Sequence, residues 1–126
     1  MKTENEISYS VRGATFTVYN RLGPGLLESV YEKAMAYELR KKGLIVECQT
    51  GIPMIYDEVL FDIGFRLDLL IENLVIVEIK SVDLLMDVHH KQLLTYLRLM
   101  NKRLGLLINF NTSSIERSII RIANNL

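Results

Sequence analysis

The segment Leu74–Lys80, with the sequence LVIVEIK, constrains the fold of this chain more than any other. Successive side chains of a strand point to opposite faces, and here both faces are apolar until Glu78 and Lys80 at the end. A strand that is apolar on both faces is usually buried in the centre of a sheet. We therefore expect Leu74–Lys80 to be a central strand whose polar end carries Glu78 and Lys80 on one face.

Helical periodicity precedes this strand. Apolar residues recur at helical spacing over residues 7–22 and 26–42, which predicts two amphipathic helices separated by a Gly-Pro-Gly turn at 23–25. The period then changes to that of strands. We expect a first strand over residues 44–49 and 52–56, and a second over residues 61–71.

A third helix and a fourth strand are expected after the central strand. Residues 88–100 read as a helix with Asp87 as its cap, and residues 104–109 as a strand. In the tail, Ile115, Ile119 and Ile122 fit a helix, whereas residues 118–122 fit a short strand. The predicted order is helix, helix, three strands, helix, strand, which is an α/β sandwich with a strand–helix–strand crossover.

Composition limits the alternatives. The 126 residues suit one domain, 1–126, with residues 1–6 and 123–126 expected to fray. No apolar run approaches the ~20 residues of a membrane span, and the polar N-terminus reads as no export signal. A single cysteine, Cys48, excludes an internal disulfide and fits a reducing, cytoplasmic location. The formal net charge of zero weakens non-specific DNA coating but is compatible with a local basic stripe.

Asp68 is the acidic residue that the fold is expected to bring next to Glu78. If the strands on either side of Glu72-Asn73 pair as a hairpin, they lie ~4.8 Å apart. Two carboxylates this close repel one another unless a cation lies between them, and Mg²⁺ or Mn²⁺ prefers such oxygen ligands. Lys80 could hold the attacking water or stabilise charge on a phosphate. Spacing alone, however, favours a water-facing salt bridge, because Glu-x-Lys is a common tripeptide.

The segment Gly25–Tyr31, GLLESVY, matches the motif that names the GxxExxY protein family. The resemblance covers roughly residues 7 to 122 and continues in order through Gly64–Leu70, Val77–Lys80, His89, Gln92–Tyr96 and Leu104–Phe110. Members of this family are placed in the PD-(D/E)XK nuclease superfamily, whose restriction-endonuclease-like core is a helix, three strands, a helix and a strand. The periodicities above predict that order independently, with an additional N-terminal helix.

The resemblance implies a role for each matching acidic or basic residue. Asp68 would be the aspartate of the superfamily signature and Glu78-x-Lys80 its (D/E)-x-K part. Asp68 and Glu78 would bind the metal ion, and Lys80 would serve the water or the phosphate. Glu28 would correspond to the acidic residue of the first core helix, which completes or orients the metal site.

Four further residues are expected around this site. Gln92 and Tyr96 look like the Gln-x-x-x-Tyr helix of the RecB-like branch, and their spacing places them on one helix face. Gln92 would touch a nucleotide or the lysine, and Tyr96 would support the substrate. His89 matches a family position near the mouth of the site. Arg66 shares the face of Asp68 and would contact phosphate, although an exposed strand arginine is the alternative.

Three functions remain open from the sequence. The first is a Mg- or Mn-dependent nuclease that hydrolyses phosphodiester bonds in DNA or RNA, with the catalytic set Glu28, Asp68, Glu78, Lys80 and Gln92. The second is a non-catalytic nucleic-acid-binding or assembly module that has kept the nuclease fold, which the neutral charge favours. The third is a nucleotide-directed hydrolase with the same metal site. A homodimer would give so small a domain a firmer grip on its substrate, but no residue indicates one.

Overall fold

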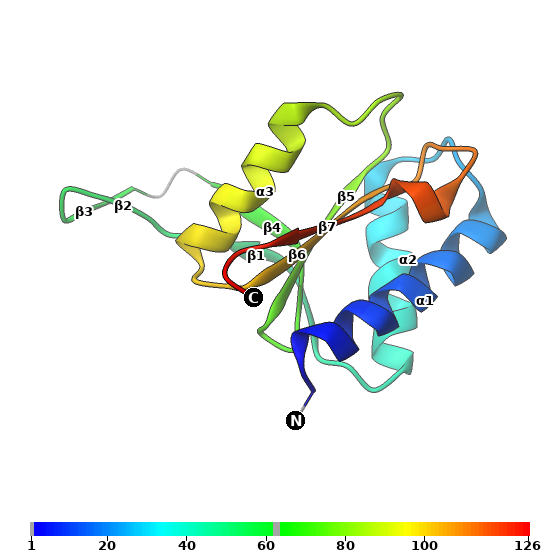
Figure 1. Cartoon of the computed structure of the whole chain (residues 1–126), viewed down its shortest axis with the longest axis horizontal. Helices are drawn as coiled ribbons and strands as arrows, with labels where there is room; N and C mark the ends of the chain where they lie inside the picture. The colour runs from blue at the N-terminus through cyan, green and yellow to red at the C-terminus, as the bar shows by residue number, and fades with distance from the viewer. Residues whose placement is uncertain (1, 62–63) are drawn as a thin grey trace.

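A mixed five-stranded sheet forms the centre of the computed structural model, which describes residues 2–61 and 64–126 (Figure 1). The strand order across the sheet is β1-β4-β5-β6-β7. β5 and β6 are parallel, and the other neighbouring pairs are antiparallel. The five strands are β1 (Val46–Gly51), β4 (Arg66–Ile71), β5 (Val75–Lys80), β6 (Leu104–Asn109) and β7 (Ile119–Ala123). The predicted α/β architecture is therefore confirmed.

β5 lies in the middle of the sheet, as its sequence predicts. It pairs with β4 through a hairpin whose turn residues, Glu72 and Asn73, have φ values of 52° and 54°. It pairs with β6 along its whole length. The side chains from Val75 to Ile79 are all buried, and only Lys80 at the end of the strand is partly exposed. The apolar side chains of β5 are thus buried on both faces of the sheet.

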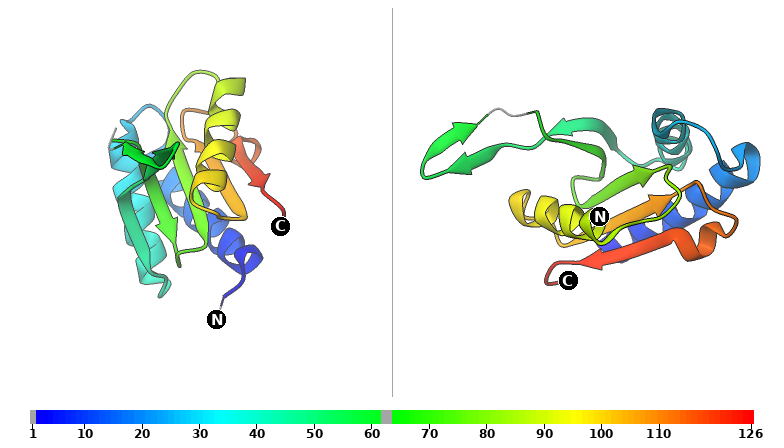
Figure 2. Two further views of the ribbon diagram at one scale, coloured as in Figure 1. Left: turned by 90° about the vertical axis from the view of Figure 1, so that its left-hand side faces the viewer. Right: turned by 90° about the horizontal axis from the view of Figure 1, so that it is seen from above.

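Helices cover both faces of this sheet (Figures 1 and 2). Val77 and Ile79 of β5 belong to the core under α1 and α2, while Ile76 packs with Leu93 and Leu97 of α3. Alternation along one strand therefore contributes to two separate cores. No helix in the described part of the chain combines the length and apolarity needed to cross a membrane. The helices are α1 (Glu4–Leu22), α2 (Glu28–Lys41) and α3 (Asp87–Leu99).

Both ends of the chain are more regular than the sequence analysis predicts. Thr3 and Glu6 form a capping box, in which the Thr3 N–H donates to Glu6 Oε1 (3.0 Å) and the Glu6 N–H donates to Thr3 Oγ1 (3.2 Å). This box starts α1 at Glu4, so the expected fraying of residues 1–6 is wrong for residues 4–6. The ambiguous tail contains both elements, a 3-10 helix η1 (Ile115–Ser118) and then β7, which extends to Ala123. The expected fraying of residues 123–126 is therefore wrong for that first residue.

Strand boundaries differ most before β4. The first strand is displaced to Val46–Gly51, and a separate hairpin of β2 (Met54–Tyr56) and β3 (Val59–Phe61) follows it. The chain reverses there because Asp57 and Glu58 both adopt positive φ values, 51° and 65°. Figure 2 shows this hairpin projecting from the body, and we call residues 54–61 the β2–β3 arm. The predicted strand over 61–71 is wrong at its start, and its residues 62–63 lie outside the described residues.

The packing of α3 on the sheet predicts the effect of a substitution at Gly105 of β6. A Cβ at Gly105 would lie 3.0 Å from the Leu93 side chain. Gly105→Val should overpack this contact and lower the free energy of unfolding by about 1–3 kcal/mol, measured by urea denaturation. In a Leu93→Ala background the same substitution should cost less, because the opposing side chain is shorter.

Gly13 of α1 provides the matched control. A Cβ there would meet only the flexible end of Lys42, at 3.2 Å. Gly13→Ala should therefore be neutral, or stabilising by up to about 1 kcal/mol through helix propensity. A loss of stability at Gly13 as large as that at Gly105 would contradict this account of the packing.

Candidate active site

Asp68 and Glu78 lie opposite one another at the point where β4 and β5 separate. The backbone pairing of the two strands ends at Leu69 and Val77, one residue before the acidic pair. Beyond it, the backbone N–H of Asp68 donates to Glu78 Oε2 (2.8 Å), and the N–H of Ile79 donates to Asp68 Oδ2 (2.8 Å). Each carboxylate thus binds the backbone of the neighbouring strand. The predicted proximity of Asp68 and Glu78 is confirmed.

Burial makes this acidic pair costly to ionise. Burial is the largest cause that raises the pKa of Asp68, although the Ile79 N–H and the charge of Lys80 oppose it. The Glu78 side chain is 5% exposed, and burial followed by the charge of Asp68 raises its pKa to about 8. A positive ion between the two groups would favour the charged form of both. The water-facing salt bridge that spacing alone favours is wrong, because Glu78 is buried.

Glu28 connects the start of α2 to the end of β5. Its Oε2 accepts a hydrogen bond from the Ser81 N–H (3.0 Å), and Ser81 Oγ donates to the Leu26 carbonyl (2.7 Å). The charge of Glu28 also contributes to the raised pKa of Asp68. The structure therefore brings Glu28 beside the acidic pair.

Tyr31 holds the segment that precedes Glu28. Its ring is fully buried and stacks on Phe110, with ring centroids 4.3 Å apart. Its hydroxyl donates to the Gly23 carbonyl (2.6 Å) and accepts from the Leu26 N–H (3.1 Å). Gly25 takes a positive φ of 96°, which suits glycine. In the GLLESVY segment, Gly25 thus forms the turn, Glu28 supplies the acidic side chain, and Tyr31 anchors the turn.

The structure adds two polar residues that the sequence analysis missed. Glu32 lies one helical turn after Glu28, and Gln49 Nε2 donates to both of its carboxylate oxygens (2.9 Å each). The same Gln49 nitrogen lies 3.5 Å from Asp68 Oδ1. Burial and then the charge of Asp68 raise the pKa of Glu32. The i, i+4 spacing from Glu28 could have indicated Glu32, whereas Gln49 joins the site only because β1 pairs with β4.

Asn109 is a third missed residue, and it holds the chain that follows Lys80. Asn109 of β6 pairs with Lys80 of β5 in the parallel register and is 5% exposed. Its Oδ1 accepts from the Val82 N–H (3.1 Å), and its Nδ2 donates to the Val82 carbonyl (2.9 Å). Buried amides need such partners. Asn109 therefore determines the path of the backbone out of β5.

The side chains expected around the site have mixed placements. Tyr96 is largely buried on the sheet side of α3, and after burial itself, the charges of Glu78 and Asp68 raise its pKa. Arg66 Nη1 donates to the Gln49 carbonyl (3.2 Å). Gln92 is exposed, and no hydrogen bond within residues 2–61 and 64–126 joins it to the acidic pair.

His89 has a structural role at the start of α3. The helix begins at Asp87, with Met86 in the cap position, so the prediction that Asp87 caps it is wrong by one residue. His89 Nδ1 instead accepts a hydrogen bond from the Met86 N–H (2.9 Å). Its expected contact with substrate stays a prediction.

The acidic residues have the chemistry to hold a hard divalent cation. Asp68, Glu78 and Glu28 each accept a backbone N–H through one carboxylate oxygen and have a second oxygen for an ion. Among the described residues, no group of three acidic, histidine or cysteine side chains is already close enough to surround a metal. Mg²⁺ is commonly bound through one or two carboxylates while keeping several waters. Asp68 and Glu78 therefore fit such an ion as its two carboxylate ligands, and Glu28 is a candidate third ligand.

Comparison with known proteins agrees with this geometry. A family model described as the PD-(D/E)XK nuclease superfamily matches residues 5–122, nearly the whole chain. The mixed sheet with helices on both faces is consistent with a restriction-endonuclease-like fold. Neither a curated protein nor a solved structure gave a significant match.

The raised pKa of Glu78 predicts a pH-dependent stability of the metal-free protein. At this group both states are protonated below its ordinary pKa of 4.5, and the folded state stays protonated up to about pH 8. Between these values the unfolded state alone releases the proton, so stability should fall as pH rises, by up to about 1.4 kcal/mol per pH unit. Urea denaturation with a chelator from pH 4 to 9 measures this slope.

Glu78→Gln is the control for this prediction. The variant keeps the side-chain shape and cannot ionise, so the slope should become smaller, with the remainder coming from Asp68 and Glu32, whose pKa values burial also raises. An unchanged slope in Glu78→Gln would show that other groups cause it.

Proposed function

Because the chain belongs to the PD-(D/E)XK nuclease superfamily, we propose that it is a divalent-metal-dependent nuclease that hydrolyses phosphodiester bonds in DNA or RNA. Members of this superfamily generally use divalent metal ions, and a nuclease implies a nucleic-acid substrate. One observation carries the proposal. Glu78 is buried and Asp68 is partly buried, and each carboxylate accepts a hydrogen bond from the backbone of the other's strand, which brings the two carboxylates together.

The acidic side chains would provide the metal site. Asp68 and Glu78 would hold Mg²⁺ or Mn²⁺, and Glu28 would be a third ligand or would orient it. When bound, the ion supplies Lewis-acid stabilisation of the phosphate and lowers the pKa of the attacking water. Glu32 and Gln49 would position Asp68 Oδ1, the oxygen that does not bind Ile79, through the contact from Gln49 Nε2.

Lys80 would supply the positive charge of the reaction. It shares a face of β5 with Glu78, and its charge lowers the pKa of both Asp68 and Glu78. An ammonium group there can orient the attacking water or stabilise negative charge that develops on the phosphate. Asn109 would act indirectly, because it holds the backbone that follows Lys80.

Helix α3 and Arg66 would meet the substrate. We assign the chain to the GxxExxY family and the RecB-like branch on the segment Gly25–Tyr31 and on the pair Gln92 and Tyr96. Gln92 is exposed and would contact a nucleotide, with Tyr96 supporting it. Arg66 and His89 would contact phosphate at the mouth of the site.

Cleavage is the direct test of this proposal. Purified protein with Mg²⁺ or Mn²⁺ should cleave DNA or RNA oligonucleotides in preference to free nucleotides. Asp68→Asn and Lys80→Ala should each reduce the rate by about 100-fold or more, since each removes a charged group from the reacting centre.

Two substitutions of the same chemical kind are the controls. Asp57→Asn changes the tip of the β2–β3 arm, and Lys102→Ala changes the opposite end of the sheet, where Lys102 binds Asn73. Both variants should cleave as the unmodified protein does. Cleavage that survives both Asp68→Asn and Lys80→Ala would point to a contaminating nuclease.

A non-catalytic binding module is the second candidate function. It is favoured by the absence of a ready-made group of three acidic, histidine or cysteine ligands among the described residues. Titration calorimetry with Mn²⁺ separates the two functions. A nuclease should bind the ion in a way that Asp68→Asn weakens at least tenfold, whereas heat of binding that is equal in the two proteins, or absent from both, would favour the module.

A further inference from the structure

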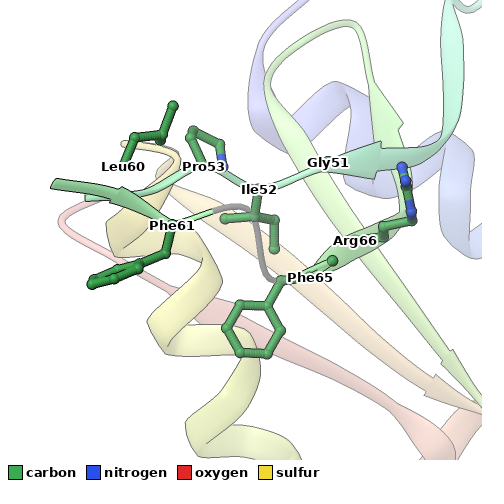
Figure 3. Close-up of a pocket in the computed structure, with 8 residues that line it drawn as sticks. Gly51, Ile52, Pro53, Leu60, Phe61, Phe65 and Arg66 are labelled. Carbon is green, nitrogen blue, oxygen red and sulfur yellow. The ribbon is translucent and has the colours of Figure 1, made fainter. Parts of the chain in front are cut away.

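A cavity of about 310 Å³ lies at the base of the β2–β3 arm, next to the start of β4 (Figure 3). One edge of its lining comes from the end of β1 and the two residues that follow it. The other comes from β3, from residues 64–65 and from the first residue of β4. The backbone N–H of Ile52 donates to the Phe65 carbonyl (2.9 Å), which ties these two edges together. The side chains that line the cavity are those of Ile52, Pro53, Leu60, Phe61, Phe65 and Arg66.

The lining combines apolar walls with one cation. Phe61 and Phe65 are 41% and 38% exposed, so their rings are accessible to a ligand. Arg66 is the charged member of the lining. Within residues 2–61 and 64–126, one of its five guanidinium donor hydrogens binds the Gln49 carbonyl and the others have no partner. An aromatic ring with an attached anion matches such a lining, because rings stack on aromatic side chains and guanidinium binds phosphate. Nucleotides have both parts.

Tyr96 connects the cavity to the acidic pair. The Phe65 ring lies 6.4 Å from the Tyr96 ring, and Tyr96 is close enough to Glu78 and Asp68 for their charges to raise its pKa. Arg66 lies two residues before Asp68 on β4, so the two side chains share one face about 7 Å apart. A strand with one phosphate at Asp68 can therefore place its neighbouring phosphate at Arg66, beside the cavity.

We propose that the cavity receives one unpaired nucleobase, stacked on Phe65 or Phe61, while Arg66 binds the adjoining phosphate. The ligand would be a single-stranded or frayed nucleic acid, because a base inside a duplex must first leave its stack and its partner. This inference rests on the proposed function for the identity of the ligand as nucleic acid. It adds the strand type, which neither the family match nor the acidic pair specifies.

Equilibrium binding in the absence of divalent metal tests the cavity separately from cleavage. Fluorescence anisotropy would compare a labelled 12-nucleotide single strand, its duplex, and single strands with one abasic position moved along the sequence. The single strand should bind more tightly than the duplex. One abasic position should weaken binding by about 5- to 150-fold, the range expected for one stacked base.

Phe65→Leu and Phe61→Leu identify the stacking residue. Leucine keeps the apolar volume and removes the aromatic face, so one of these variants should bind the intact strand 5- to 150-fold more weakly and no longer respond to the abasic position. Tyr9→Leu is the matched control, because Tyr9 is an exposed aromatic residue on α1 and should not affect binding. Circular dichroism would verify that each variant is folded.

Three results of the binding experiment would overturn the proposal. These are duplex binding as tight as single-strand binding, abasic strands that all bind as the intact strand does, and unchanged affinity in both phenylalanine variants. A change of molecular mass in these variants, with affinity independent of the base, would show a second copy on the cavity and would also overturn it. Cleavage of single strands and duplexes at equal rates would support the proposed nuclease function and contradict the base pocket. Binding that depends on the abasic position, without any cleavage, would support the base pocket and contradict the nuclease function.

Discussion

Two hydrogen bonds between β4 and β5, from the Asp68 N–H to Glu78 and from the Ile79 N–H to Asp68, are the interaction on which the candidate site depends. They occur where the backbone pairing of β4 and β5 stops, so each carboxylate replaces a ladder partner that the neighbouring strand has lost. A buried Glu78 beside a partly buried Asp68 is unfavourable with both groups ionised unless a proton or a cation neutralises them. The apolar length of β5 supplies the stability that lets its polar end hold this charge.

Hydrogen bonds attach the other segments of the site to the C-terminal end of β5 and to the residues that follow it. The start of α2 reaches β5 through the Glu28 contact with the Ser81 N–H, and Tyr31 anchors the turn before Glu28. On the other side, Asn109 fixes the chain that leaves β5. These contacts join segments far apart in sequence, so the acidic pair is held by the whole domain and not by one loop.

The β2–β3 arm gives this small domain a surface beyond its sheet. Its base combines exposed phenylalanine rings with Arg66, and Tyr96 links that surface to the acidic pair. Large exposed apolar side chains on a small protein usually mark a surface that binds something. With a nucleobase in this cavity, the preference for single-stranded nucleic acid and the binding of metal would depend on neighbouring residues of β4, Arg66 and Asp68. Mutation could then change the strand preference and the metal binding separately.

Local pattern alone determined the helices, the burial of β5, the hairpin that brings Asp68 to Glu78, and the match of the Gly25–Tyr31 segment. These features depend on periodicity and on residues close in sequence. The capping box of Thr3 and Glu6 is equally local, because its two residues are three positions apart. Tertiary structure alone decided that Gln49 and Asn109 join the site, that Glu78 is buried deeply enough to raise its pKa, and that a separate arm precedes β4. The physical reason is that strand order and burial arise from contacts between distant segments, which no local spacing encodes.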